Sequence, residues 1–216
     1  MKAAHYVIAA PGKEGRAIDA LAKAGIDAKT FPAIMAGPLS DTLAQMPYYR
    51  FGGGTIQRSP SSHGAWLSHA ALLAMGRSLG VEWLGVWEDD LGAGDQIGWR
   101  ELRLPPDCGV VYLGGILWGR PQDYGEPMGD GLWRVTQARP ISGTHAVMIH
   151  RRAMDDVLAA YARADMTEDD LLSCACIDAM RDGRWSTCFV QPWLAWQVDR
   201  RETWPRELIE EVGRQK

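Results

Sequence analysis

The stretch WLGVWEDD, residues 83–90, decides the fold that we expect for this chain. Residues 83–87 form an uncharged apolar run that predicts a buried strand, and the carboxylates of Glu88, Asp89 and Asp90 follow it without a break. In sheets built from parallel strands, ligands lie beyond the carboxyl ends of the strands. The stretch therefore predicts a core strand and, directly after it, the position of a binding site.

On both sides of this stretch, strand-like and helix-like segments alternate. Short apolar runs predict further strands at residues 4–9, 28–34, 109–113, 132–137, 144–149 and 188–190. Helical periodicity and capping residues predict helices that end at Gly25, begin after Ser40, cover 63–79 and 151–164, follow Thr167, and occupy 206–214. We expect long loops at 50–64 and 114–131. This order predicts an α/β fold with a mostly parallel sheet flanked by helices, in one domain over 1–199 with a helical tail over 200–216.

The composition is that of a folded domain. The chain has 216 residues, is 46% hydrophobic and carries a net charge of -4, which argues against disorder and against nucleic-acid binding by the whole surface. The amino-terminal apolar run is shorter than a secretory signal, and no segment approaches the length of a membrane span. The four cysteines lack the spacing of a zinc site or a disulfide framework. We therefore expect a cytoplasmic protein with reduced thiols and no obligate protein partner.

The acidic triplet predicts a divalent-cation site. Three adjacent carboxylates repel one another, and a bound cation relieves that repulsion. Oxygen ligands suit Mg²⁺ or Mn²⁺, which can bridge from carboxylates to a diphosphate. Alternation along an extended chain puts Glu88 and Asp90 on one side and Asp89 on the other. We expect Asp90 as a direct metal ligand and Glu88 as a metal ligand or a contact to the ribose, whereas an isolated triplet of this kind would be a solvated turn.

Several short motifs accompany the triplet in a fixed order: YVI at 6–8, FPA at 31–33, GAWLSH at 64–69, WEDD at 87–90, VYLG at 111–114 and GTHAVMI at 143–149. In these motifs and their order the chain resembles the family 25 glycosyltransferases, which include lipooligosaccharide and collagen galactosyltransferases. The likeness covers residues 4–199. The chain departs from the family at 9–12, where AAPG replaces Asn-Leu-Asp-Arg, and at Ala65, where the family has Cys.

The resemblance implies a GT-A type, Rossmann-like fold, a UDP-sugar donor, a divalent metal and inversion at the anomeric carbon. It implies donor contacts from Ile8 and Ala9 at the end of the first strand and from Glu88 and Asp89. Asp178 falls where the family has a helical Asp, and it is the candidate base that takes the proton from the acceptor hydroxyl.

Three polar side chains are further candidates for donor binding. Ser68 and His69 are expected near the start of a helix, where free backbone N–H groups attract anions such as a diphosphate. A lone His on a helix is otherwise a packed, hydrogen-bonded residue. Arg58, in the Gly- and Ser-rich loop, is a candidate clamp for phosphate, or else a solvated loop residue.

The acceptor leaves two alternatives open. A saccharide is what the resemblance implies, and tryptophans in apparent loops have flat faces that suit sugar rings or bases: Trp118, Trp133, Trp193, Trp196 and Trp204. The second acceptor is a hydroxymethylated base in DNA, because many arginines could line a groove: Arg50, Arg58, Arg100, Arg103, Arg120, Arg134, Arg139, Arg151, Arg152, Arg200 and Arg201. A catalytically silent module that only binds a nucleotide sugar is the alternative outside enzymes.

Overall fold

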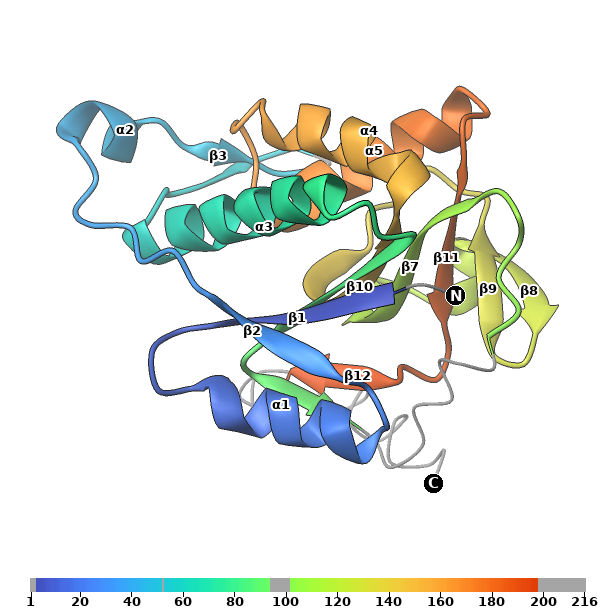
Figure 1. Cartoon of the computed structure of the whole chain (residues 1–216). Coiled ribbons are helices and arrows are strands. Elements are labelled where there is room, and N and C mark those ends of the chain that lie inside the picture. Colours follow the sequence, from blue (N-terminus) through green and yellow to red (C-terminus); the bar gives the residue numbers. More distant parts are fainter. Residues whose placement is uncertain (1–2, 52, 94–101, 198–216) are drawn as a thin grey trace.

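The computed structural model describes residues 3–51, 53–93 and 102–197. Its centre is an eight-stranded sheet with the strand order β2-β1-β5-β10-β7-β11-β9-β8 (Figure 1). In chain order these strands are β1 (Ala3–Ala9), β2 (Ala28–Pro32), β5 (Trp83–Glu88), β7 (Cys108–Ile116), β8 (Gly125–Gly129), β9 (Leu132–Val135), β10 (Ser142–His150) and β11 (Ser186–Val190).

The sheet is mixed but mostly parallel. The pairs β1–β2, β1–β5 and β7–β11 are parallel, whereas β10 and β9 are each antiparallel to both of their neighbours. It follows that all strands except β10 and β9 run in one direction. The predicted α/β fold with a mostly parallel sheet flanked by helices is confirmed. The tail predicted at 200–216 lies outside the described residues.

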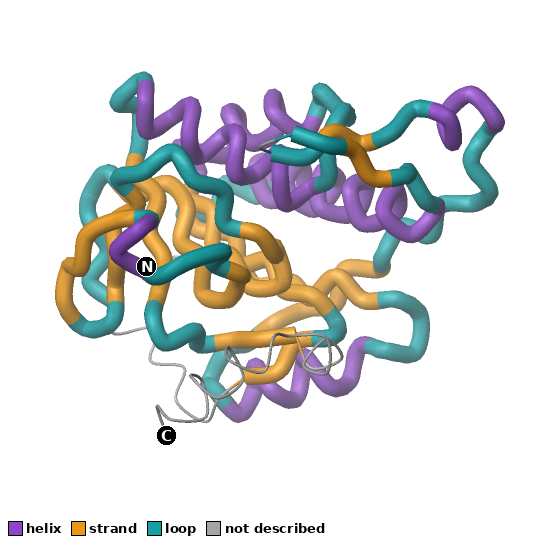
Figure 2. Tube along the Cα trace, turned by 180° about the vertical axis from the view of Figure 1, so that it is seen from behind, coloured by secondary structure: helices purple, strands orange, loops and turns teal. Residues whose placement is uncertain are grey.

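Helices cover both faces of the sheet. One face carries three of the helices, namely α3 (Pro60–Ser78), α4 (Arg151–Tyr161) and α5 (Glu168–Arg181). The other face carries α1 (Glu14–Lys23) and the two-stranded sheet of β6 (Leu91–Ala93) and β12 (Ala195–Gln197), as Figures 1 and 2 both show. A short arm between β2 and α3 holds α2 (Asp41–Gln45), β3 (Tyr48–Tyr49) and β4 (Thr55–Ile56).

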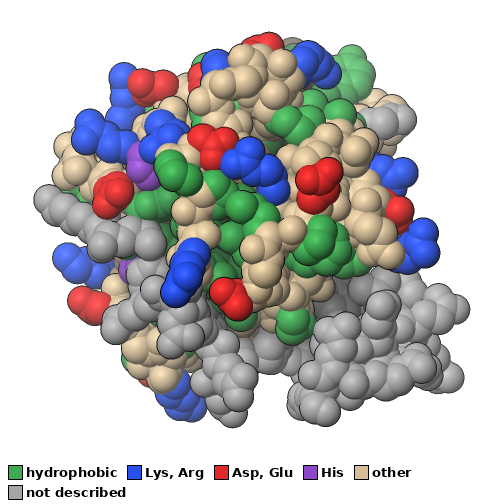
Figure 3. Space-filling view, turned by 90° about the vertical axis from the view of Figure 1, so that its right-hand side faces the viewer, with side chains coloured by type: hydrophobic (Ala, Val, Ile, Leu, Met, Phe, Trp, Pro, Cys, Tyr) green, Lys and Arg blue, Asp and Glu red, His purple; other side chains and the backbone are tan. Residues whose placement is uncertain are grey.

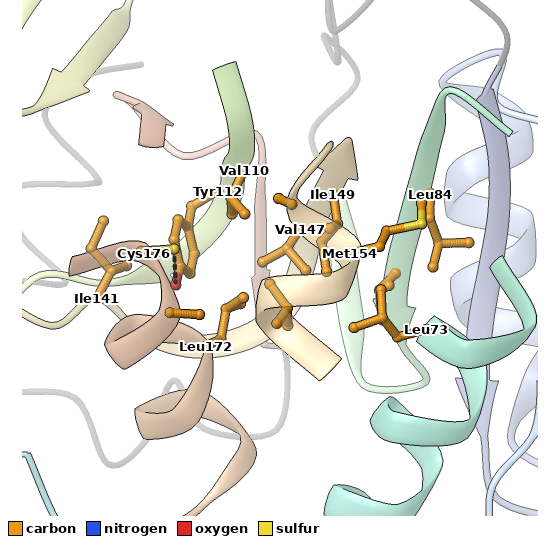
Figure 4. Packing of buried hydrophobic residues seen from close by; sticks show 14 of the residues in the cluster. Leu73, Leu84, Val110, Tyr112, Ile141, Val147, Ile149, Met154, Leu172 and Cys176 are labelled. Atoms are coloured by element: carbon orange, nitrogen blue, oxygen red, sulfur yellow. Dashed lines mark hydrogen bonds between the residues drawn. The ribbon is translucent and has the colours of Figure 1, made fainter. Parts of the chain in front are cut away.

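The strands divide their side chains between two cores because successive residues point to opposite faces. In β5, Leu84 and Val86 join the core beneath α3, α4 and α5, while Trp83 and Trp87 join the core beside α1. Figure 4 shows the first core, where Leu84 lies near Leu73 of α3 and other apolar side chains of the sheet and helices. By the same alternation Glu88 points toward α3, α4 and α5.

The start of α3 differs from the prediction. The helix begins at Pro60 instead of residue 63, because Ser59 and Ser62 form a capping box and Pro60 occupies the first turn. This places Ser68 and His69 in the third turn, where backbone N–H groups are already bonded within the helix. The expectation that these two residues lie beside free N–H groups at a helix start is therefore wrong.

The segment predicted as a long loop over 114–131 is also more ordered than expected. β7 continues to Ile116, a short 3-10 helix η2 (Pro121–Asp123) follows, and β8 pairs with β9 as a hairpin. The turn between them uses Asp130 and Gly131 with positive φ angles of 51° and 73°. Because Asp and Gly tolerate this conformation, the Gly-rich composition that suggests a loop here encodes a tight turn.

The order of the first strands creates a switch point. β1 is flanked by β2, which it reaches through α1 on one face, and by β5, which follows α3 on the opposite face. Where successive connections leave a strand toward opposite sides, a crevice opens at the carboxyl ends of the neighbouring strands. The strand order therefore puts the switch point of the sheet beside residues 9–10 and 88–90. Within the described ranges, every helix is too short or too polar to cross a bilayer.

We expect Leu84→Ala to test the packing beneath α3. Leu84 is fully buried, so its truncation should lower the free energy of unfolding by about 2–5 kcal/mol in urea denaturation. Leu79→Ala is the matched control, because Leu79 is 48% exposed and its truncation should cost well under half as much. Equal costs for the two variants would contradict the described core.

Candidate active site at the carboxyl edge of the sheet

Glu88 is held in place by two residues from different elements. Its Oε1 lies 3.2 Å from Nε2 of His69 in α3 and accepts a hydrogen bond of 3.0 Å from Oγ1 of Thr144 in β10. The Thr144 and His69 side chains are themselves 3.5 Å apart. β10 runs antiparallel to β5, so its first residues lie at the carboxyl end of β5. The structure thus brings a histidine, a carboxylate and a hydroxyl together at the predicted edge.

Burial and charge shift the pKa values of Glu88 and His69 in opposite directions. Burial would raise the pKa of Glu88, but the hydrogen bond and positive charge of His69 lower it to about 2. Burial would lower the pKa of His69, but the bond and charge of Glu88 outweigh it, so this pKa is raised. The pair is therefore an ionic contact in which Glu88 is charged.

Two further acidic side chains, Glu168 and Asp169, close the site from the start of α5. Burial and the charge of Glu88 raise the pKa of Asp169, which lies near Gly143 and Thr144 of β10. Burial and the charge of Asp169 raise the pKa of Glu168 to about 8. Oε2 of Glu168 is buried and has no hydrogen-bond partner among the described residues. A buried carboxyl that titrates near neutral pH is suited to proton transfer.

A glycine shapes the strand where these acids meet. Gly143 has a φ of +87°, and a Cβ at this position would lie 3.0 Å from Nδ1 of His145 and 3.4 Å from Cα of Gly115. The pairing of β10 with β7 is irregular between Ser142 and Val147. This bulge presents the Gly143 backbone and the Thr144 hydroxyl to the carboxylates of the site.

Asp89 joins the end of β1 to the end of β5 at the switch point. Its Oδ2 accepts a 2.8 Å hydrogen bond from the backbone N–H of Ala10, the first residue after β1. The carbonyl of Ala9 accepts a 2.9 Å bond from the N–H of Ala33, and the side chains of Ile8 and Ala9 are buried. The ends of β1 and β5 are therefore joined at the switch point by the contact between Ala10 and Asp89.

The acidic triplet does not alternate over its full length. β5 ends at Glu88, and Asp89 and Asp90 form a turn leading to β6. The prediction that Glu88 and Asp90 share one side rests on an extended chain and does not apply past Glu88. Asp90 is partly buried in this turn.

The predicted cation site has few protein donors. In the described part of the chain, no group of three or more His, Cys, Asp or Glu side chains could hold a metal ion. Oε1 of Glu88 is already bonded to His69 and Thr144. Mg²⁺ is commonly held by one or two carboxylates together with substrate phosphates. The residues present fit a cation that shares its ligands with a bound diphosphate, and they do not fit an all-protein cage.

Two predicted site residues, Ser68 and Asp178, bond to residues outside the cluster around Glu88. Ser68 donates to the Gly64 carbonyl at 2.7 Å and accepts from Ile34 N–H at 2.8 Å, so it joins α3 to the segment after β2. Asp178 is exposed on α5 and lies 3.5 Å from Arg181, so the structure does not bring it to the cluster.

Arg58 is buried within the protein and is not presented to a ligand. Its Nε donates to the Met46 carbonyl at 3.1 Å, its Nη2 donates to the Ala164 carbonyl at 2.8 Å, and its guanidinium lies 3.9 Å from the Tyr48 ring centre. The prediction of a solvated Arg58 is therefore wrong, because its guanidinium is buried and bonded to two carbonyls. The side chain fastens the arm to the segment that precedes α5.

Sequence patterns predict only part of this site. The sequence predicts residues 144–149 only as a strand. It predicts the start of α5 only as a helix cap, and the bond from Asp170 N–H to Thr167 Oγ1 confirms that cap. The signal that could have identified Glu168 and Asp169 is a pair of acidic residues at a helix start, where they would face the carboxyl edge.

Comparisons with known proteins give no family. No protein-family model and no curated protein matches the chain. Among solved structures, a glycosyltransferase involved in glycosylation of the major capsid of PBCV-1 is 8% identical with a TM-score of 0.40, over 74% of this chain and 65% of that one. A197 from STIV is 13% identical with a TM-score of 0.44, over 88% and 82%. A protein assigned as a glucose-1-phosphate thymidylyltransferase of Bacillus anthracis is 12% identical with a TM-score of 0.41, over 87% and 68%.

The likeness to these three structures is weak. All three TM-scores are below 0.5 and the identities are at most 13%, so they assign no activity to this chain. The motif resemblance to family 25 gains no support from them either. The function proposed below rests on the chain's own residues.

Replacing Glu168 with Gln should change how stability depends on pH. A carboxyl with a raised pKa in the folded state contributes stability that is present below its unfolded value of 4.5 and is lost as the pH rises through about 8. The raised pKa of His69 acts in the same direction above its unfolded value of 6.5. In urea denaturation across this range, the free energy of unfolding should fall with pH, and Glu168→Gln should flatten the slope. An unchanged slope in Glu168→Gln would show that Glu168 is not buried among acids.

Arg58→Met separates the structural role of Arg58 from phosphate binding. Loss of the guanidinium leaves two carbonyls without their donor, so the free energy of unfolding should fall by about 2–4 kcal/mol. Arg50→Met is the control, because Arg50 is exposed in the same segment. Unchanged stability together with weaker nucleotide binding would restore the phosphate-clamp role.

Proposed function

We propose that the chain is a cation-assisted glycosyltransferase that moves a hexose from a nucleotide sugar, of which a UDP-sugar is the first candidate, to a hydroxyl of a saccharide acceptor with inversion. The observation that carries this proposal is the meeting of Glu88, His69, Glu168 and Asp169 at the carboxyl edge of a doubly covered, mostly parallel sheet. The ordered motifs that resemble family 25 and a GT-A type fold support the same reading.

The donor belongs at the switch point. The crevice between β1 and β5 is where such sheets bind nucleotides, and the Ala10–Asp89 junction lies there. Asp90 is in the adjoining turn. A divalent cation bound by Asp90 and by the donor's diphosphate would offset the charge that develops on the leaving nucleotide diphosphate.

Glu168 is the proposed base in place of Asp178. The acceptor oxygen attacks the anomeric carbon, the bond from that carbon to the diphosphate oxygen breaks, and the hydroxyl proton passes to Glu168 Oε2. This oxygen is buried and has no partner among the described residues, and its carboxyl titrates close to neutral pH. Asp169 lies beside it, near Gly143 and Thr144 of β10.

A hydroxymethylated nucleobase in DNA is less well supported than a saccharide as the acceptor. Arg58 is buried, and Arg134 and Arg120 pair with Asp107 and Asp123. On the face seen in Figure 3, basic and acidic side chains are interspersed instead of gathering by sign. Arg100, Arg200 and Arg201 lie outside the described residues. A groove that follows a nucleic-acid backbone needs unpaired basic side chains.

Glu168→Gln and Asp178→Asn distinguish the two candidate bases. Removing a general base lowers kcat by roughly 10²–10⁴-fold, so Glu168→Gln should lose this much activity, measured as release of nucleotide diphosphate from a UDP-sugar with an acceptor present. Because the base must be ionised, wild-type kcat should rise with pH through about 8. Asp178→Asn should keep wild-type activity. Loss in Asp178→Asn with none in Glu168→Gln would reverse the assignment.

A thermal-shift screen of nucleotide sugars with Mn²⁺, Mg²⁺ or EDTA tests the donor and the cation. A ligand at a hundredfold excess over Kd stabilises the native state by ~2.7 kcal/mol, so the donor should raise Tm only when the cation is present. Asp90→Asn should remove the dependence on the cation, while the control Asp89→Asn should lower the Tm without ligand because it weakens the Ala10 contact. A shift that is the same in EDTA would contradict the cation's role.

A further inference from the structure

Trp118 is an exposed aromatic side chain that is held in a fixed position. It lies two residues beyond the end of β7, and 67% of it is exposed. Its ring Nε1 donates a 3.0 Å hydrogen bond to Oγ of Ser142, and its backbone N–H donates a 2.7 Å bond to the hydroxyl of the buried Tyr124. Both the backbone and the ring of Trp118 are thus fixed while its apolar faces remain open.

The bond to Ser142 places Trp118 next to the site. Consecutive residues of β10 connect them: Ser142 accepts the bond from Trp118, Gly143 lies near Asp169, and the hydroxyl of Thr144 donates to Glu88. Two residues of extended chain span roughly 7 Å at most. The bond that fixes the indole is therefore two residues along β10 from the Thr144 hydroxyl that donates to Glu88.

Core packing does not account for this side chain. Trp87 is fully buried, and Trp133 stacks on Phe189 with ring centres 5.9 Å apart. Trp118 joins neither apolar core, although its large surface would be stabilised by burial. An indole that is fixed by hydrogen bonds and left open beside a polar site is suited to stacking on a ligand.

We propose that Trp118 is the stacking platform for a saccharide acceptor, and this inference rests on the proposed function. The apolar C–H face of a hexose would lie on the indole, and the reacting hydroxyl would point toward Glu168. The neighbouring groups Ser142, Asp169 and Glu168 carry oxygens that can accept hydrogen bonds from sugar hydroxyls.

A saccharide fits this position better than a nucleobase in single-stranded nucleic acid. Sites that stack bases also follow the phosphate backbone with basic side chains. Here Arg120 pairs with Asp123 at 3.9 Å, the guanidinium of Arg139 lies 5.9 Å from the Tyr124 ring centre, and the adjacent site is acidic. Away from a bound cation, acidic surroundings disfavour the phosphates of a nucleic acid and suit neutral hydroxyls.

The test compares Trp118→Ala, Trp118→Phe and wild type on an array of immobilised neutral oligosaccharides with UDP and Mn²⁺ present, followed by calorimetry with the best-bound glycan. Loss of one stacked ring typically weakens binding about tenfold or more. We expect this loss in Trp118→Ala and most of the affinity to remain in Trp118→Phe. Met128→Ala, which removes another exposed apolar side chain, is the control and should bind as wild type does.

Hydrolysis of the nucleotide sugar by water is measured on the same variants. It should be unchanged in Trp118→Ala, because water replaces the acceptor. Equal glycan affinity in Trp118→Ala, no glycan bound by wild type, or Trp118-dependent binding of a single-stranded oligonucleotide alone would overturn the inference. Glycan binding that depends on Trp118 without any nucleotide-sugar hydrolysis would support the platform and reject the proposed transfer.

Discussion

The contact of His69 with Glu88 is the interaction on which the site depends. A partly buried glutamate is stabilised by a partner, and the imidazole of His69 in α3 supplies both a hydrogen bond and a positive charge. Thr144 adds a second bond from β10. These contacts fix α3, β5 and β10 relative to one another at the edge where the chain leaves β5. Burial raises the pKa values of Glu168 and Asp169, and the charges of neighbouring carboxylates raise them further.

The topology explains why such different segments meet. β1 is the switch strand, so the carboxyl ends of β1 and β5 lie at the switch point, and the reversed strand β10 brings its first residues to the same edge. A parallel strand in the place of β10 would put Ser142 and Thr144 at the opposite edge. The reversal therefore allows one strand to connect the carboxyl end of β5, the acids of α5 and the indole of Trp118.

The sequence predicts the fold better than it predicts the site. Strands and helices can be predicted from local patterns such as the apolar run at residues 83–87. Within the described residues, the elements expected from these patterns are present. Arg58 and Asp178 could not be judged in this way, because burial of one and exposure of the other depend on tertiary packing. Thr144 and Glu168 become site residues only through the antiparallel position of β10 and the docking of α5. Trp118 could be recognised as a loop aromatic, but its exposure and its bond to Ser142 are properties of the folded chain.

Hydrogen–deuterium exchange with and without a nucleotide sugar and Mn²⁺ tests the central claim most directly. If the crevice at the ends of β1 and β5 binds the donor, amide exchange should slow in residues 9–13 and 88–92 and stay unchanged in the β8–β9 hairpin. Absence of protection at both segments, with a donor shown to bind, would contradict the assignment of this edge as the donor site.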